Sequence, residues 1–172
     1  MSSDDARSYF EFLANLGLTK HYGSMQATRE LVELCHVRSG AYVLDVGCGV
    51  GATPCYLARE YGCRAVGVDL LGKMIEQSRE RAKLEEVEGL VEFIVADARA
   101  LAFADDRFDA VIMESVNFFF QDKREAMREY VRVTKPGGYV GITEMTWLHP
   151  PSPEAAAYYK RVVYADALAA SG

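Results

Sequence analysis

Hydrophobic and polar positions follow two different periodicities along this chain. From residue 41 onward, short apolar runs typical of buried strands alternate with longer stretches that are apolar on one helical face. Strands are predicted at residues 42–46, 64–68, 90–95, 108–113 and 139–143, with a Lys-Pro-Gly-Gly turn at 135–138 before the last strand. Helices are predicted at 8–18, 25–35, 53–61, 72–84, 123–132 and 154–170. This alternation predicts an α/β fold with a mostly parallel sheet and helices on both of its faces.

The first predicted strand runs directly into a glycine-rich turn. Gly47, Gly49 and Gly51 occupy every second position, and Ala52 then opens a helix. Glycines let the backbone approach a ligand closely, and the helix N-terminus behind such a turn favours negative charge. The order of strand, glycine turn and helix is therefore typical of a nucleotide-like ligand site.

Acidic residues follow the four later strands. Asp69, Asp97, Glu114 and Glu144 each lie at, or within two residues of, the end of a predicted strand. In an open parallel sheet the ligand binds beyond the carboxyl ends of the strands, so these acids are expected at one rim together with the glycine turn.

Two cofactors remain compatible with this turn. Gly47-x-Gly49-x-x-Ala52 satisfies the dinucleotide fingerprint, and Asp69 lies where a ribose-binding acid belongs, so an NAD-dependent oxidoreductase is one alternative. Asp45, two residues before the first glycine, would place a negative charge beside a pyrophosphate. A ligand with an amino group and a sulfonium tolerates that charge better, which favours S-adenosylmethionine. Asp97 next to an apolar residue also suits an adenine amino group.

Several motifs together carry a resemblance to a known family. They lie at residues 45–51, 67–69, 96–98, 107–111 and 132–138. In these stretches the chain resembles the class I S-adenosylmethionine-dependent methyltransferases, and looks most similar to the small-molecule branch with the ubiquinone, sterol and tocopherol methyltransferases. The resemblance covers roughly residues 22 to 147. It implies a Rossmann-like doubly wound sheet with strand order 3-2-1-4-5 and methyl transfer from S-adenosyl-L-methionine, with S-adenosylhomocysteine as product.

The resemblance also implies which residues bind the cofactor. The glycines would approach its methionine part, Asp69 its ribose, and Leu70 one face of the adenine. Asp97 and Ala98 would hold the adenine edge, and two residues after the fourth strand would face the methionine end. The expected cofactor-binding residues are Asp45, Gly47, Cys48, Gly49, Asp69, Leu70, Asp97, Ala98, Glu114 and Ser115.

Methyl transfer needs alignment of the reactants, and it needs a base only if the acceptor must lose a proton. The candidate catalytic residues are Glu114, His21 and Tyr22. The wall for the acceptor is expected after the fourth and fifth strands, where aromatic residues suit a small, apolar or lipid-like molecule. The expected substrate-binding residues are Asn117, Phe118, Phe119, Glu144 and Trp147.

Composition excludes several classes of function. The net charge of -6 disfavours binding of a nucleic acid, which needs a basic face. No apolar run is long enough for a membrane span, and the acidic start lacks the plan of a signal peptide, so a soluble cytoplasmic protein is predicted. The four cysteines have no metal-ligand spacing, so no metal is predicted.

The chain departs from the family after the fifth strand. The resemblance implies a helix and then a hairpin of strands six and seven, but only a Pro-rich loop and one predicted helix follow here. An uncovered fifth strand would be an exposed sheet edge. We therefore expect either a piece of a longer protein or a homo-oligomer in which another chain covers this edge.

The predicted organisation has three parts. Residues 1–40 form an N-terminal helical cap, 41–148 the cofactor-binding core, and 149–172 an incomplete lid or acceptor region. With the acceptor region incomplete, a non-catalytic cofactor-binding or assembly module with the same fold is a second alternative to a methyltransferase.

Overall fold

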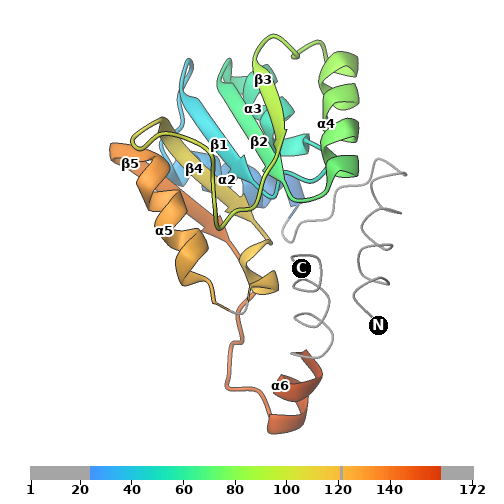
Figure 1. Cartoon of the computed structure of the whole chain (residues 1–172), viewed down its shortest axis with the longest axis vertical. Helices are drawn as coiled ribbons and strands as arrows, with labels where there is room; N and C mark the ends of the chain where they lie inside the picture. Colours follow the sequence, from blue (N-terminus) through green and yellow to red (C-terminus); the bar gives the residue numbers. More distant parts are fainter. Residues whose placement is uncertain (1–23, 121, 160–172) are drawn as a thin grey trace.

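The fold is built on one sheet of five parallel strands. The computed structural model describes residues 24–120 and 122–159. The strands are β1 (Tyr42–Val46), β2 (Arg64–Asp69), β3 (Val91–Val95), β4 (Phe108–Glu114) and β5 (Thr134–Thr143). Their order is β3-β2-β1-β4-β5, and every pairing between neighbours is parallel (Figure 1). Both the Rossmann-like class and the strand order expected from the sequence are confirmed.

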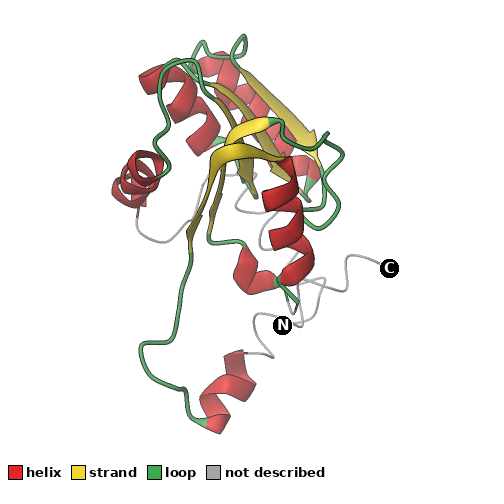
Figure 2. Cartoon of the chain, turned by 90° about the vertical axis from the view of Figure 1, so that its left-hand side faces the viewer, coloured by secondary structure: helices red, strands yellow, loops and turns green. Residues whose placement is uncertain are grey.

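Helices lie on both faces of the sheet (Figure 2). The helices next to the sheet are α2 (Ser24–Leu34), α3 (Ala52–Tyr61), α4 (Gly72–Leu84) and α5 (Arg124–Val133). The short 3-10 helix η1 (Asn117–Phe119) follows β4, and α6 (Pro153–Tyr159) lies away from the sheet, after the segment that follows β5 (Figure 1, Figure 2). The predicted helix at 8–18 and the second half of the one at 154–170 lie outside the described residues. No helix among the described residues is long and apolar enough to cross a membrane.

Alternate residues of the central strands supply two separate hydrophobic layers. Leu44 and Val46 of β1 point to the layer that contains Tyr130 of α5. Val43 points to the opposite layer, with Leu31 of α2 and further residues of α3. Because β1 and β4 are covered on both sides, most of their residues are apolar, four of five in β1 and five of seven in β4. This rigid centre carries the glycine turn that follows β1.

The start of β5 differs from the sequence prediction. The Lys-Pro-Gly-Gly stretch was expected to form a turn before a strand at 139, yet β5 already begins at Thr134. Thr134 pairs with Phe108 and Tyr139 pairs with Ala110, so a bulge of 135–138 lies opposite a single residue of β4. Proline and glycines break the regular ladder without ending the strand, because they occupy the bulge.

Strand β5 lies at the edge of the sheet and, among the described residues, pairs only with β4. Within the bulge, Lys135 Nζ lies 2.6 Å from Asp109 Oδ1. This ion pair connects the two strands where their regular pairing is interrupted.

One arginine fastens the loop between β3 and β4 to α5. Arg132 donates from Nη1 to the carbonyl of Phe103 (2.7 Å) and from Nη2 to that of Leu101 (2.8 Å). Its guanidinium also binds Glu129, whose Oε2 accepts the backbone N–H of Leu101 (2.7 Å). Since this loop follows Asp97, the arrangement also fixes one end of the candidate site.

We expect Arg132→Met to lower the free energy of unfolding by about 1–3 kcal/mol, because two partly buried carbonyls and the carboxylates of Glu129 and Asp105 lose a charged donor. Urea denaturation followed by circular dichroism measures this. Arg128→Met is the matched control, because Arg128 lies exposed on the same helix. Equal destabilisation by both variants would contradict the anchoring role of Arg132.

Candidate functional site

The glycine turn between β1 and α3 is held against β2. The N–H groups of Gly47 and Cys48 both donate to the carbonyl of Val68, at 2.8 and 2.9 Å. Gly47 has φ +73°, and a Cβ there would collide with Val116. Gly49 has φ +53°, and a Cβ there would meet no heavy atom within 4 Å. The turn is therefore closed at Gly47 and open at Gly49, where a ligand can approach the backbone.

Asp69, the last residue of β2, fixes the open part of the turn. Its Oδ2 accepts the N–H of Gly49 (3.0 Å) and its Oδ1 accepts the N–H of Leu71 (2.9 Å). The carbonyl of Gly49 accepts a hydrogen bond from Ser78 of α4 (2.8 Å). Burial raises the pKa of Asp69 to about 6. Each carboxylate oxygen keeps acceptor capacity, as the binding of ribose hydroxyls requires.

Two more carboxyl groups lie beneath the turn. Asp45 is only 3% exposed, and its side chain has no hydrogen-bond partner among the described residues. Burial raises its pKa well above the usual value, and Glu114 and Asp69 raise it further. Glu114 is also buried, and it accepts hydrogen bonds from Thr28 (2.8 Å) and Thr53 (3.0 Å). Three acids at the ends of β1, β2 and β4 attract a positively charged ligand group.

The expected adenine end contains an ion pair. Arg99 Nη2 lies 2.6 Å from Asp97 Oδ2, and the Arg99 Nε and backbone N–H also donate to this carboxylate. The hydrogen bonds from Arg99 lower the pKa of Asp97. Leu70 is 48% exposed and offers an apolar surface next to Asp69. Ala98 packs in the core cluster of β1, β2 and β4. A ring can therefore contact Leu70 directly, whereas the Ala98 side chain lies inside the protein.

Cys48 and Ser115, the other two residues expected to bind the cofactor, both have buried side chains. The side chain of Cys48 is buried in the core with Cys55 and Phe93, so only its backbone faces the turn. Ser115 is buried, has φ +61°, and donates its N–H to the carbonyl of Thr143 (2.8 Å).

The expected acceptor wall is divided between the core and the surface. Asn117 is buried and its Oδ1 accepts a hydrogen bond from Tyr130 (3.1 Å), so it points into the protein. Phe119 is half-buried on η1, Glu144 is half-buried just after β5, and Trp147 is 51% exposed. The side chain of Phe118 lies outside what the structure describes. The wall residues do share the carboxyl edge of the sheet with the glycine turn.

The candidate catalytic residues His21 and Tyr22 lie outside the described residues. Three residues of the site were not expected from the sequence: Thr53, Ser78 and Arg99. Thr28 was expected to contact the cofactor from the N-terminal cap, but its hydrogen bond with Glu114 was not expected. Thr53 follows the glycine turn closely, which is a local signal. Thr28 contacts a residue 86 positions away, so no local pattern could have revealed that contact.

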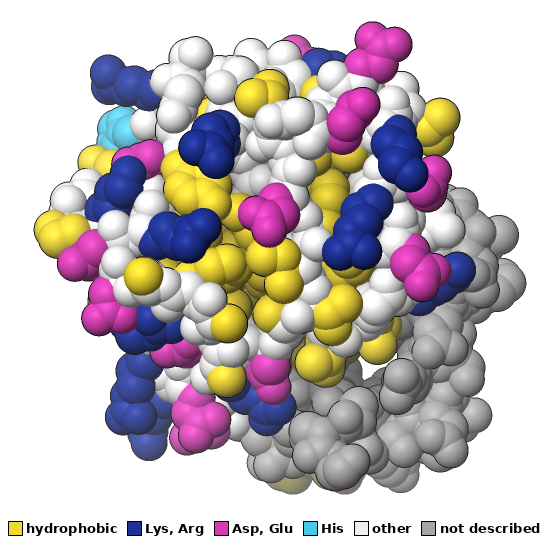
Figure 3. All heavy atoms as spheres, turned by 45° about the horizontal axis from the view of Figure 1, so that its top comes forward, with side chains coloured by type: hydrophobic (Ala, Val, Ile, Leu, Met, Phe, Trp, Pro, Cys, Tyr) yellow, Lys and Arg dark blue, Asp and Glu magenta, His cyan; other side chains and the backbone are white. Residues whose placement is uncertain are grey.

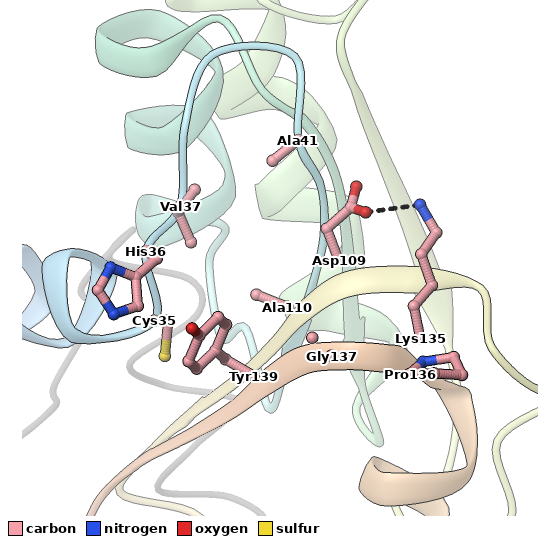
Figure 4. Close-up of a pocket in the computed structure, with 11 residues that line it drawn as sticks. Cys35, His36, Val37, Ala41, Asp109, Ala110, Lys135, Pro136, Gly137 and Tyr139 are labelled. Carbon is pink, nitrogen blue, oxygen red and sulfur yellow. Dashed lines mark hydrogen bonds and ion pairs between the residues drawn. The ribbon is translucent and has the colours of Figure 1, made fainter.

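A separate cavity of about 230 Å³ lies at the opposite end of the sheet (Figure 4). It is lined by residues from the starts of β4 and β5, such as Asp109 and Lys135, and by His36, whose ring packs against Tyr139. None of the expected cofactor or acceptor residues lines it. On the face seen in Figure 3, acidic and basic side chains are interspersed, so this face presents no continuous basic tract for a nucleic acid.

Comparison with known proteins identifies relatives of the chain. The model of the methyltransferase domain family matches residues 44–142, more than half of the chain. Methyltransferase GfsG of Streptomyces halstedii is 38% identical over 118 residues, which cover 69% of this chain and 42% of that protein. Phosphoethanolamine N-methyltransferase 3 of Arabidopsis thaliana is 33% identical over 183 residues, covering 95% of this chain and 36% of that protein. The chain thus spans less than half the length of either relative.

A solved structure shares both the fold and part of the sequence. It is a SAM-dependent methyltransferase from Thiobacillus denitrificans in complex with S-adenosyl-L-homocysteine. The TM-score is 0.68 at 27% identity, and the match covers 81% of this chain and 56% of that one.

The raised pKa of Asp69 predicts a pH dependence of stability. Because the folded pKa, about 6, lies above the usual value of 3.8, the folded state favours the protonated carboxyl. Its stabilising contribution is complete below the unfolded pKa and is lost as pH rises through about 6. From pH 5 to pH 7, wild type should lose about 1 kcal/mol of unfolding free energy relative to Asp69→Asn.

Urea denaturation at several pH values measures this difference. Asp97→Asn is the control, because the pKa of Asp97 is lowered and it stays ionised throughout this window. A parallel pH dependence in wild type and Asp69→Asn would contradict the effect of burial on Asp69.

Proposed function

The chain belongs to the methyltransferase domain family, and on this premise we propose that it transfers a methyl group from S-adenosylmethionine to a small-molecule acceptor. One observation carries the proposal most directly. Asp45, Asp69 and Glu114 lie around a glycine turn that is open at Gly49, and Asp45 is buried without a partner among the described residues. Carboxylates accept hydrogen bonds and attract cations. A ligand with cationic groups and a ribose therefore suits these three acids better than the negatively charged pyrophosphate of a dinucleotide does.

The residues at the turn fit the cofactor in type and position. In the proposed arrangement, Gly47 and Gly49 approach its methionine part and Glu114 accepts from its amino group. Asp69 accepts from the ribose hydroxyls with the lone pairs that Gly49 and Leu71 leave unused. Leu70 and Asp97 hold the adenine. When bound, the cofactor supplies a methyl group that is already activated by its attachment to a positively charged sulfur.

The protein's own contribution is alignment and the exclusion of water. Both oxygens of Glu114 already accept hydroxyl hydrogen bonds and the residue is 7% exposed. We therefore assign Glu114 to the cofactor rather than to the acceptor proton. If the acceptor must lose a proton, the remaining candidates for the base are His21 and Tyr22.

We propose a small and largely apolar acceptor. Support comes from the residues that follow the carboxyl end of β5, where the large apolar side chains of Met145, Trp147 and Leu148 are exposed. One relative is named for phosphoethanolamine, a polar molecule, so the class of acceptor needs its own test.

Turnover with a radiolabelled methyl donor provides that test. We expect label to enter apolar acceptors such as phenols and prenylated rings, and not small polar amines such as phosphoethanolamine. Labelling of polar amines alone would contradict the apolar acceptor but keep the methyl transfer. Binding of the cofactor without turnover on either panel would favour the alternative of a non-catalytic module.

Two glycine variants test the proposed position of the cofactor. Gly49 and Gly40 both have positive φ, and at both positions a Cβ meets nothing within 4 Å. Only Gly49 lies in the turn, so Gly49→Ala should weaken S-adenosylhomocysteine binding by about tenfold or more, equal to about 1.4 kcal/mol. Gly40→Ala should change the affinity less than about twofold, although it carries a similar backbone strain. Equal affinities of both variants, measured by calorimetry, would place the cofactor elsewhere.

A further inference from the structure

Two threonines from different helices converge on one buried carboxylate. Thr28 Oγ1 of α2 lies 2.8 Å from Glu114 Oε2, and Thr53 Oγ1 of α3 lies 3.0 Å from Glu114 Oε1. All three side chains are at most 7% exposed. A hydroxyl that donates to a carboxylate stabilises its charged form. Each oxygen of Glu114 therefore has its own neutral donor in a place that water scarcely reaches.

Asp45 is the neighbour of Glu114 on the same face of the sheet. Asp45 pairs in register with Ile112 of β4, and Glu114 lies two positions further along that strand. Because side chains alternate along strands, Asp45 and Glu114 point to the same side, the side of α2 and α3. Neither threonine binds Asp45, which is 3% exposed and without a hydrogen-bond partner among the described residues. The two carboxyl groups therefore have opposite environments.

Within residues 24–120 and 122–159, the other titratable groups near this pair come from the remaining elements. Asp69 ends β2, Cys48 lies in the turn, and Glu144 follows β5. Burial raises the pKa of Cys48 well above its usual value, so the thiol stays neutral. The charged residues of α2 are exposed, and those of α3 lie in its last turns: Arg29, Glu30, Glu33, Arg59 and Glu60. Near Glu114, α2 and α3 therefore contribute neutral hydroxyl groups, those of Thr28 and Thr53, and not their charged residues.

We propose that Thr28 and Thr53 are positioning residues which hold Glu114 ionised and aligned for the amino group of the cofactor, while the adjacent Asp45 retains its proton. Like charges at close range do not both ionise in a buried site, and the group with donors keeps the charge. The pair then presents one negative charge at a fixed place. Through Thr28, helix α2 becomes part of the cofactor site although it precedes the glycine turn.

The affinity for S-adenosylhomocysteine, measured by calorimetry between pH 5 and pH 8, tests this inference. Affinity should fall at acidic pH as Asp69, whose pKa is about 6, becomes protonated. Each threonine hydroxyl favours the charged form of the carboxylate that it donates to, so Thr28→Val and Thr53→Val should move this fall to higher pH. They should also weaken binding at pH 7 by about three- to tenfold, equal to about 0.7–1.4 kcal/mol, because Glu114 loses one of the two hydroxyl groups that hold it in place.

Three further variants separate positioning from a merely structural effect. Thr28→Ser keeps the hydroxyl and should restore the wild-type pH profile. Thr134→Val removes a buried hydroxyl that donates to the carbonyl of Tyr130 and should leave the profile unchanged. Thr28→Ala removes the hydroxyl without adding bulk. It should shift the profile in the same direction as Thr28→Val, which separates the loss of the hydroxyl from a poor fit of the valine side chain. Asp69 is present in every variant, so the differences report on Glu114.

The inference rests on the proposed position of the cofactor, which Glu114→Gln tests separately. If Glu114→Gln leaves the affinity unchanged, the proposed contact with the amino group is wrong, and this inference falls with it. If Glu114→Gln weakens binding but the Thr→Val and Thr→Ala variants keep the wild-type profile, only the positioning role of the threonines is overturned. A shift in Thr134→Val as large as in Thr28→Val would likewise overturn it.

Discussion

The attachment of the glycine turn to the end of β2 is the interaction on which the rest of the site depends. The carbonyl of Val68 accepts two backbone N–H groups of the turn, and Asp69 accepts a third, that of Gly49. A turn after a strand is ordinarily mobile because few contacts hold it. Here the central strand of a five-stranded sheet carries it, β2 binds its backbone, and Ser78 of α4 binds the carbonyl of Gly49. The backbone is thereby fixed before any ligand arrives, which lowers the entropy cost of binding.

The same rim stores unfavourable electrostatic energy. Asp45, Asp69 and Glu114 are gathered where water cannot solvate them fully, and the pKa of both aspartates is raised as a consequence. Such an arrangement lowers the stability of the free protein at neutral pH. A cation placed among the acids offsets this penalty. The free protein is therefore less stable, and its affinity for a cationic ligand is higher. Functional sites commonly show this exchange, because a group that is satisfied only by its ligand is unsatisfied without it.

Much of the fold and part of the site could be predicted from the sequence for physical reasons. Strands buried on both faces must be apolar, and helices with one buried face must be periodic, so the pattern reveals both. The position of Asp69 beside the glycine turn could be predicted, because it ends the strand next to the one that carries the turn. The contacts of Glu114 with Thr28 and of Asp97 with Arg99 could not, since they depend on side-chain directions and on distant segments. The bulge at 135–138 was misjudged because proline and glycine indicate a break in regular pairing without indicating its kind.

The central claim is that the turn binds S-adenosylmethionine and its product rather than a dinucleotide. Calorimetric titration of the same protein sample with S-adenosylhomocysteine and with NAD tests it most directly. We expect saturable binding of S-adenosylhomocysteine at one molecule per chain and no heat of binding from NAD. Saturable binding of NAD without binding of S-adenosylhomocysteine would contradict it, and the acids around the glycine turn would then need another explanation.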